Sequence, residues 1–94
     1  IPETFALHQN FPNPFNPITT LSYSLPKGSD VRFAIFDMLG NEVATLVNSH
    51  QQAGFKSVQW DGTGSMGRAV SAGVYLYRIE AGEFVETKKM LLLK

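Results

Sequence analysis

Residues 20–25 read Thr-Leu-Ser-Tyr-Ser-Leu, and this stretch decides the fold class. Leu21, Tyr23 and Leu25 alternate with hydroxyl-bearing residues, so every second side chain is apolar or aromatic. Side chains of a β-strand point alternately to the two faces of a sheet, whereas an α-helix repeats its apolar positions every three to four residues. The stretch therefore predicts a half-buried strand with one face rich in hydroxyl groups.

The same period of two continues along the chain. Val31, Phe33 and Ile35 form the next alternating set. Shorter candidate strands cover residues 43–47 and 55–60. A long one follows at residues 74–79 and a last one at 84–93, and an edge strand is expected at residues 5–9. About seven short strands separated by turn signals predict an all-β fold, an immunoglobulin-like antiparallel β-sandwich.

Glycine marks the turns. Gly40, next to Asn41, predicts a tight reversal because both residues tolerate the positive φ of hairpin turns. Ala81-Gly82 predicts another, and a register symmetric about it places Ile79 opposite Phe84.

Residues 60–67 read Trp-Asp-Gly-Thr-Gly-Ser-Met-Gly and have the glycines of a calcium or phosphate loop. A calcium loop needs several oxygen ligands, however, and a phosphate loop needs a lysine that opens a helix. We expect a tight turn in which Asp61 accepts backbone N–H bonds while Trp60 packs against the core.

Residues 9–17 read Gln-Asn-Phe-Pro-Asn-Pro-Phe-Asn-Pro and cannot form regular secondary structure. Each proline lacks an N–H and holds the preceding residue in extended geometry. We expect a stiff connector, with Phe11 and Phe15 anchored on the core and the asparagines bonded to nearby backbone. Its motif residues are Asn10, Pro12, Asn13, Pro14, Phe15, Asn16 and Pro17. The chain is then one domain, residues 1–94, with an edge strand and connector over 1–17 and the sandwich over 18–94.

Length and composition narrow the class of protein. The chain has 94 residues, enough for one modest core. Hydrophobic residues make up 44% and charged residues 17%, as in a folded protein. Eight basic residues balance eight acidic ones, so we expect neither a nucleic-acid nor an anionic membrane partner. The longest apolar runs have four residues, whereas a transmembrane segment needs about 20, so we expect no such segment.

No residue pattern indicates a reaction centre. His8 and His50 have no Ser or Asp at a triad-like or metal-like spacing. Glu80 and Glu83, the nearest carboxylate pair, flank a turn, where solvated charges are usual. The chain contains no cysteine, which excludes thiolate sites and disulfides. We therefore expect no enzyme activity, no metal site and no cofactor.

One sugar-binding interpretation stays open. Tyr75 and Tyr77 share a strand face and, together with Trp60, could form an aromatic platform. In so small a domain these side chains more often belong to the core.

Several motifs taken in order resemble a bacterial family. They occupy residues 10–17, 19–23, 36–43, 53–54, 58–62, 73–78 and 88–94. Together they resemble the type A C-terminal sorting domain of the type IX (Por) secretion system, and the middle of the chain also resembles the Ig-like domain of the flagellar hook-capping protein. Relatives place another acidic residue after Gly62, where this chain has Thr63.

The resemblance implies a non-enzymatic sorting signal at the C-terminus of a secreted cargo protein. Such a signal reaches the periplasm through an ordinary leader, is recognised by the outer-membrane translocon and is commonly removed afterwards. The implied partners are the translocon, its processing and attachment proteins and an upstream cargo domain. The implied location is outside or on the surface of a Gram-negative bacterium. Because the chain begins at Ile1 without an initiator Met or a leader, we expect a piece of a longer protein.

The last strand supplies the candidate recognition site. Its apolar end could present an exposed edge or face to a receptor, with the lysines setting the orientation. The candidate residues are Gly73, Val74, Tyr75, Lys88, Lys89, Met90, Leu91, Leu92, Leu93 and Lys94. Two alternatives stay open: an Ig-like structural spacer of a multidomain extracellular enzyme, and a carbohydrate-binding module.

Overall fold

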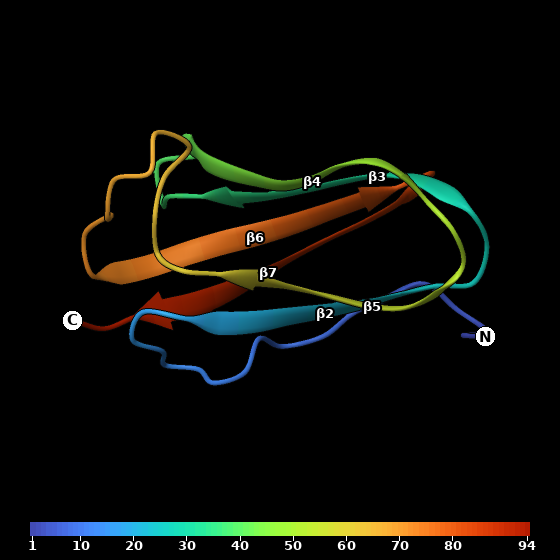
Figure 1. Cartoon of the computed structure of the whole chain (residues 1–94), viewed down its shortest axis with the longest axis horizontal. Helices are drawn as coiled ribbons and strands as arrows, with labels where there is room; N and C mark the ends of the chain where they lie inside the picture. The colour runs from blue at the N-terminus through green and yellow to red at the C-terminus, as the bar shows by residue number, and fades with distance from the viewer.

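Seven antiparallel strands form two facing sheets in the computed structural model, which describes residues 1–94 (Figure 1). The strands are β1 (Ala6–Leu7), β2 (Thr19–Leu25), β3 (Ser29–Phe36), β4 (Glu42–Gln51), β5 (Gly54–Trp60), β6 (Gly73–Ala81) and β7 (Phe84–Leu92). Sheet A has the order β1-β2-β5 and sheet B the order β4-β3-β6-β7. This arrangement confirms the predicted all-β, immunoglobulin-like sandwich.

The core lies between the sheets and follows the alternation seen in the sequence. Leu21, Tyr23 and Leu25 of β2 are buried on the inner face of sheet A. The Tyr23 ring packs on Phe33 of β3 with centroids 5.4 Å apart, and Phe33 stacks on Tyr77 of β6 at 6.0 Å. These rings span both sheets, so a short chain gains a continuous apolar core.

The turn between β3 and β4 is built around one carboxylate. Oδ1 of Asp37 accepts hydrogen bonds from the backbone N–H groups of Leu39 and Asn41, both at 2.9 Å. The bonds from Asn41 and its neighbours lower the pKa of Asp37. Gly40 has a φ of 89°, which confirms the predicted reversal.

The predicted register of the last hairpin is wrong. Ala81 pairs with Phe84 and Ile79 pairs with Glu86, because Gly82 and Glu83 form the turn between them. Gly82 takes a φ of 60°, so this positive-φ residue is the first of the two turn residues. The centre of the turn therefore lies one residue further along the chain than predicted. The partners change by two residues, and each side chain keeps its face of the sheet.

The connector crosses from one sheet to the other. Near its start, Phe11 forms an antiparallel bridge with Thr20 in sheet A, and near its end Phe15 forms a parallel bridge with Leu92 in sheet B. Phe15 is buried, as predicted, but Phe11 is 79% exposed, so its predicted anchoring is wrong. The backbone of Phe11 holds that end of the connector and leaves the ring in solvent. The peptide bonds before Pro12, Pro14 and Pro17 are cis.

The buried Asn10 holds the connector in place through hydrogen bonds. Its Nδ2 donates hydrogen bonds to the Pro12 carbonyl at 3.2 Å and to Thr19 Oγ1 at 3.0 Å. Its backbone N–H donates to the Tyr77 hydroxyl at 3.0 Å, and this hydroxyl donates to the His8 carbonyl at 2.8 Å. The predicted bonding of the connector asparagines to nearby backbone is confirmed for Asn10, and Tyr77 joins sheet B to the connector.

Candidate functional site

The start of β6 and the end of β7 bring most of the candidate recognition residues together. The register pairs Gly73 with Leu92, Val74 with Leu91 and Tyr75 with Met90. Residues separated in the sequence therefore share one corner of sheet B, at the end of the molecule where the chain terminates (Figure 1).

Three of the ten candidate residues have side chains that are not accessible. Tyr75, Met90 and Leu92 are 7%, 2% and 0% exposed, because they occupy the inner face of sheet B. A receptor cannot reach these three side chains in the folded domain, so they cannot contribute directly to the predicted recognition surface. The intervening residues Val74 and Leu91 point to the outer face of the sheet.

The connector covers the edge of β7 at this corner. Phe15 N–H donates to the Leu91 carbonyl at 3.0 Å, and Leu93 N–H donates to the Phe15 carbonyl at 2.8 Å. Leu91 N–H donates to Oδ1 of Asn13 at 3.0 Å, and Gln9 Nε2 donates to the Lys89 carbonyl at 2.9 Å. The predicted exposed edge is therefore absent from residues 89–93, and only the outer face is free there.

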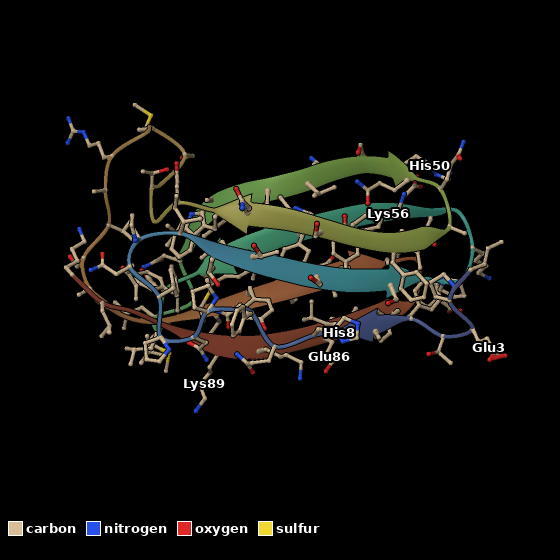
Figure 2. The ribbon with its side chains drawn as sticks, turned by 60° about the horizontal axis from the view of Figure 1, so that its bottom comes forward. Glu3, His8, His50, Lys56, Glu86 and Lys89 are labelled. Atoms are coloured by element: carbon tan, nitrogen blue, oxygen red, sulfur yellow. The ribbon has the colours of Figure 1, made fainter.

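The accessible surface is a shallow apolar hollow with one cation. A depression of about 190 Å³ is lined by Asn13, Val74, Lys89, Met90 and Leu91. Val74 and Leu93 are 41% and 45% exposed. We define the terminal patch as Val74, Lys89, Leu91 and Leu93. Figure 2 shows the Lys89 side chain extending away from the body of the domain.

The other lysines of the candidate set lie outside the terminal patch. Lys88 lies on the inner side of β7, where its Nζ is 3.4 Å from Oε2 of Glu86. Lys94 is exposed beyond the last strand. Of the three lysines, Lys89 alone lies in the hollow beside Val74 and Leu91.

Gly73 begins β6 with a φ of 149°. No atom lies within 4 Å of the position that a Cβ would occupy, so a side chain would fit here without a steric clash. Glycine is favoured by the backbone conformation instead, because L-residues with a side chain rarely adopt this φ.

Trp60, Tyr75 and Tyr77 form no sugar-binding platform. Trp60 is 2% exposed, its ring centroid lies 5.5 Å from that of Tyr75, and its Nε1 donates to the Thr63 carbonyl at 2.8 Å. Tyr77 is fully buried. The predicted core position of Trp60 is confirmed, and the platform is wrong because all three rings face inward.

The turn after Trp60 forms as expected. Oδ1 of Asp61 accepts a hydrogen bond from Thr63 N–H at 3.1 Å, and Gly62 has a φ of 76°. The turn places the Thr63 carbonyl where the Trp60 indole can reach it. Asp61 therefore has a structural role.

Several other polar and ionisable side chains form pairs. His8 Nε2 lies 3.4 Å from Ser24 Oγ, and His50 Nδ1 lies 3.0 Å from Oδ1 of Asp30. Glu80 pairs with Arg78 at 3.1 Å. No group of three or more His, Cys, Asp or Glu residues is placed to hold a metal ion. None of the elements is a helix that could cross a membrane.

Residues 17–85 match the family profile described as the FlgD Ig-like domain. The chain belongs to this family. The match covers the strands from β2 to β6 and ends at the start of β7, so the terminal patch lies mostly beyond it. No curated protein matches the chain.

Two solved structures from Porphyromonas gingivalis share the fold of this Ig-like domain. One is dimeric latent PorU, with a TM-score of 0.75 and 22% identity over 93% of this chain and 9% of PorU. The other is PorZ, described as an essential bacterial surface component of the type-IX secretion system, with a TM-score of 0.65 and 17% identity over 95% of this chain and 12% of PorZ. The Ig-like domain thus corresponds to a small part of each protein.

Proposed function

We propose that this Ig-like domain is a non-catalytic C-terminal sorting domain that directs a secreted cargo protein through the outer membrane by the type IX secretion system. The observation that carries the proposal is the terminal patch, an exposed apolar hollow with one lysine at the end of the last strand. The fold shared with PorZ, a component of that system, and the motif pattern of the chain support it.

In this proposal a component of the translocon docks on the terminal patch. Val74 and Leu91 lie opposite each other on adjacent strands and supply the apolar contact, while Lys89 orients the partner by its charge. The cargo lies upstream in the same chain and passes through the periplasm. After export, the domain is removed or the cargo is attached at the surface of the Gram-negative cell.

Two surface substitutions test the patch without removing core residues. A leader–reporter–domain fusion carrying V74S and L91S is produced in a host with the translocon, and the reporter is measured in the medium and at the cell surface. We expect secretion to fall at least about ten-fold, the effect of losing roughly 1.4 kcal/mol of binding. The matched control is F55S, because Phe55 is 77% exposed on the outer face of sheet A. Unchanged secretion of the V74S/L91S fusion, with F55S as wild type, refutes the proposal.

An Ig-like structural spacer is the second candidate. It is favoured by the family match, which stops at residue 85 and omits most of β7. A spacer requires only that the domain folds, so the V74S/L91S fusion would then be secreted like the wild type. The same experiment in a host that lacks the translocon distinguishes the two functions, because a spacer gives equal secretion in both hosts.

A further inference from the structure

The connector leaves the first half of the β7 edge unpaired. Backbone groups of Lys89, Leu91 and Leu93 point away from β6 and bind Gln9, Asn13 and Phe15. Backbone direction alternates along a strand, so the N–H and C=O groups of Val85 and Thr87 point the same way. No strand or loop of the chain pairs with them there. Such a row is a template for another strand.

We propose that residues 85–89 bind the same residues of a second copy of this chain as an antiparallel strand pair centred on Thr87. This register places Glu86 of each copy directly opposite Lys88 of the other. The two charged pairs flank the two-fold axis, where the two Thr87 residues exchange both backbone hydrogen bonds. Two four-stranded B sheets then form one continuous sheet. The inference is independent of the sorting function.

The charges on the strand favour a second copy as the occupant. Glu86 and Lys88 have side chains 38% and 30% exposed on the same side of β7, and they form an ion pair within one chain. Figure 2 shows Glu86 at the lower rim of the domain in that view. In the antiparallel pair each charge meets its opposite directly across, and opposite charges at such positions stabilise strand pairing.

The two remaining long edges are less suited to self-pairing. Strand β5 carries Lys56 and no acidic residue, and Lys56 has no ion-pair partner within the chain. In an antiparallel pair of two β5 strands, no acidic residue would lie opposite Lys56 to compensate its charge. The edge strand β4 contains two register shifts, and Ser65 N–H binds the Val43 carbonyl at its beginning. Bulges and covering loops protect such edges from pairing.

The proposed interface is small, so we expect the dimer to be weak. A pairing of residues 85–89 buries less than the ~1,200 Å² of a stable interface, so we expect a dissociation constant on the order of 100 µM. Pairing also requires the Gln9 side chain to leave the Lys89 carbonyl, which the second copy then binds. The Lys89 side chain points to the outer face and stays accessible in the dimer.

A cysteine at the axis tests the register. The natural chain has no cysteine, so T87C has one thiol. Hydrogen-bonded antiparallel partners have Cα atoms about 5.5 Å apart, within the range for a disulfide. We expect mild oxidation of the whole chain at about 100 µM to cross-link T87C at least five-fold faster than S57C. Ser57 is the matched control because it lies exposed in the middle of β5. Equal rates for the two variants overturn the proposal.

Charge exchange then tests the pairing of Glu86 with Lys88. In the T87C background, E86K and K88E each place like charges opposite one another, so each alone should cross-link at the rate of S57C. Mixing the two variants restores opposite charges at both positions, and we expect the mixed species to recover most of the T87C rate. Circular dichroism melting of each variant checks that the fold is retained. A mixture that cross-links no faster than its components overturns the proposal.

Discussion

Trp60 joins three parts of the domain through one side chain. Its ring contacts Phe15 of the connector, with centroids 5.9 Å apart, and Tyr75 of β6, and its indole N–H binds the following turn. We expect W60A to lower the free energy of unfolding by about 3–5 kcal/mol, the usual cost of deleting a large buried aromatic side chain. Urea denaturation measures the loss, with W60F as a milder control. A loss below about 1 kcal/mol would contradict the burial of this ring.

The Tyr77 hydroxyl is a second point of attachment. It binds both Asn10 N–H and the His8 carbonyl, so Y77F leaves a donor and an acceptor of the connector without partners. We expect Y77F to destabilise the domain by about 2–4 kcal/mol. Y75F is the matched control, because the Tyr75 hydroxyl makes a single bond, to the Ser71 carbonyl, near the surface. Equal stability losses for the two variants would show that the connector does not depend on Tyr77.

Tyr77 also makes stability depend on alkaline pH. Burial raises the pKa of Tyr77 to about 12, although the hydrogen bond from Asn10 opposes the rise. The folded state therefore prefers the protonated phenol. This preference is fully present below about pH 10, the pKa of an unfolded tyrosine, and is lost as the pH rises toward 12. Urea denaturation between pH 8 and 11.5 should show falling stability, with a shallower fall for Y77F. Parallel profiles for the two proteins would exclude this contribution.

At the residue scale, the sequence predicts roles where local chemistry is decisive. Asp61 and Gly62 form the expected turn from their own backbone and carboxylate, and the lone Trp60 lies in the core as predicted. Phe11 and Phe15 both lie between an asparagine and a proline, yet only Phe15 is buried. Which ring enters the core depends on the path of the connector between the sheets, and that path carries no periodic signal.

Within the elements, Gly73 sets the start of β6. Its φ of 149° and the open space around its Cα indicate a purely conformational requirement. We expect G73A to cost about 1–2 kcal/mol, measured by thermal melting. G28A tests the opposite case, in which space is limited but the backbone is not strained. Gly28 has no positive φ, and His50 Nε2 lies 3.2 Å from the position that a Cβ would occupy. A smaller loss for G73A than for G28A would refute the conformational explanation.

Strand existence is predictable from the sequence, whereas strand ends and pairing are not. The region predicted as residues 43–47 is β4, which covers Glu42–Gln51 and includes polar residues with no alternation. Its length comes from pairing with β3 through two bulges, a tertiary effect. Likewise, the sequence identifies the corner where β6 meets β7, but it does not show that the connector occupies the β7 edge there.

At the scale of the whole molecule, some C-terminal residues pack in the core while others lie on the surface. Met90 and Leu92 are almost fully buried, and loss of each costs roughly 2–5 kcal/mol. A domain of this size has only about 5–14 kcal/mol of stability in total. We expect deletion of residues 90–94 to abolish cooperative unfolding in circular dichroism, whereas deletion of Lys94 alone leaves the melting temperature unchanged. A folded 90–94 deletion would contradict the assignment of β7 to the core. Such a deletion therefore cannot separate recognition from folding.

The bridge between Phe15 and Leu92 sets an order of events during protein synthesis. A ribosome releases the connector early, but the strand that must receive it is the last one to be made. Until that strand emerges, Phe15 has no complete site and sheet B lacks its final member. The nascent chain is thus held short of its finished structure until translation of this domain is complete.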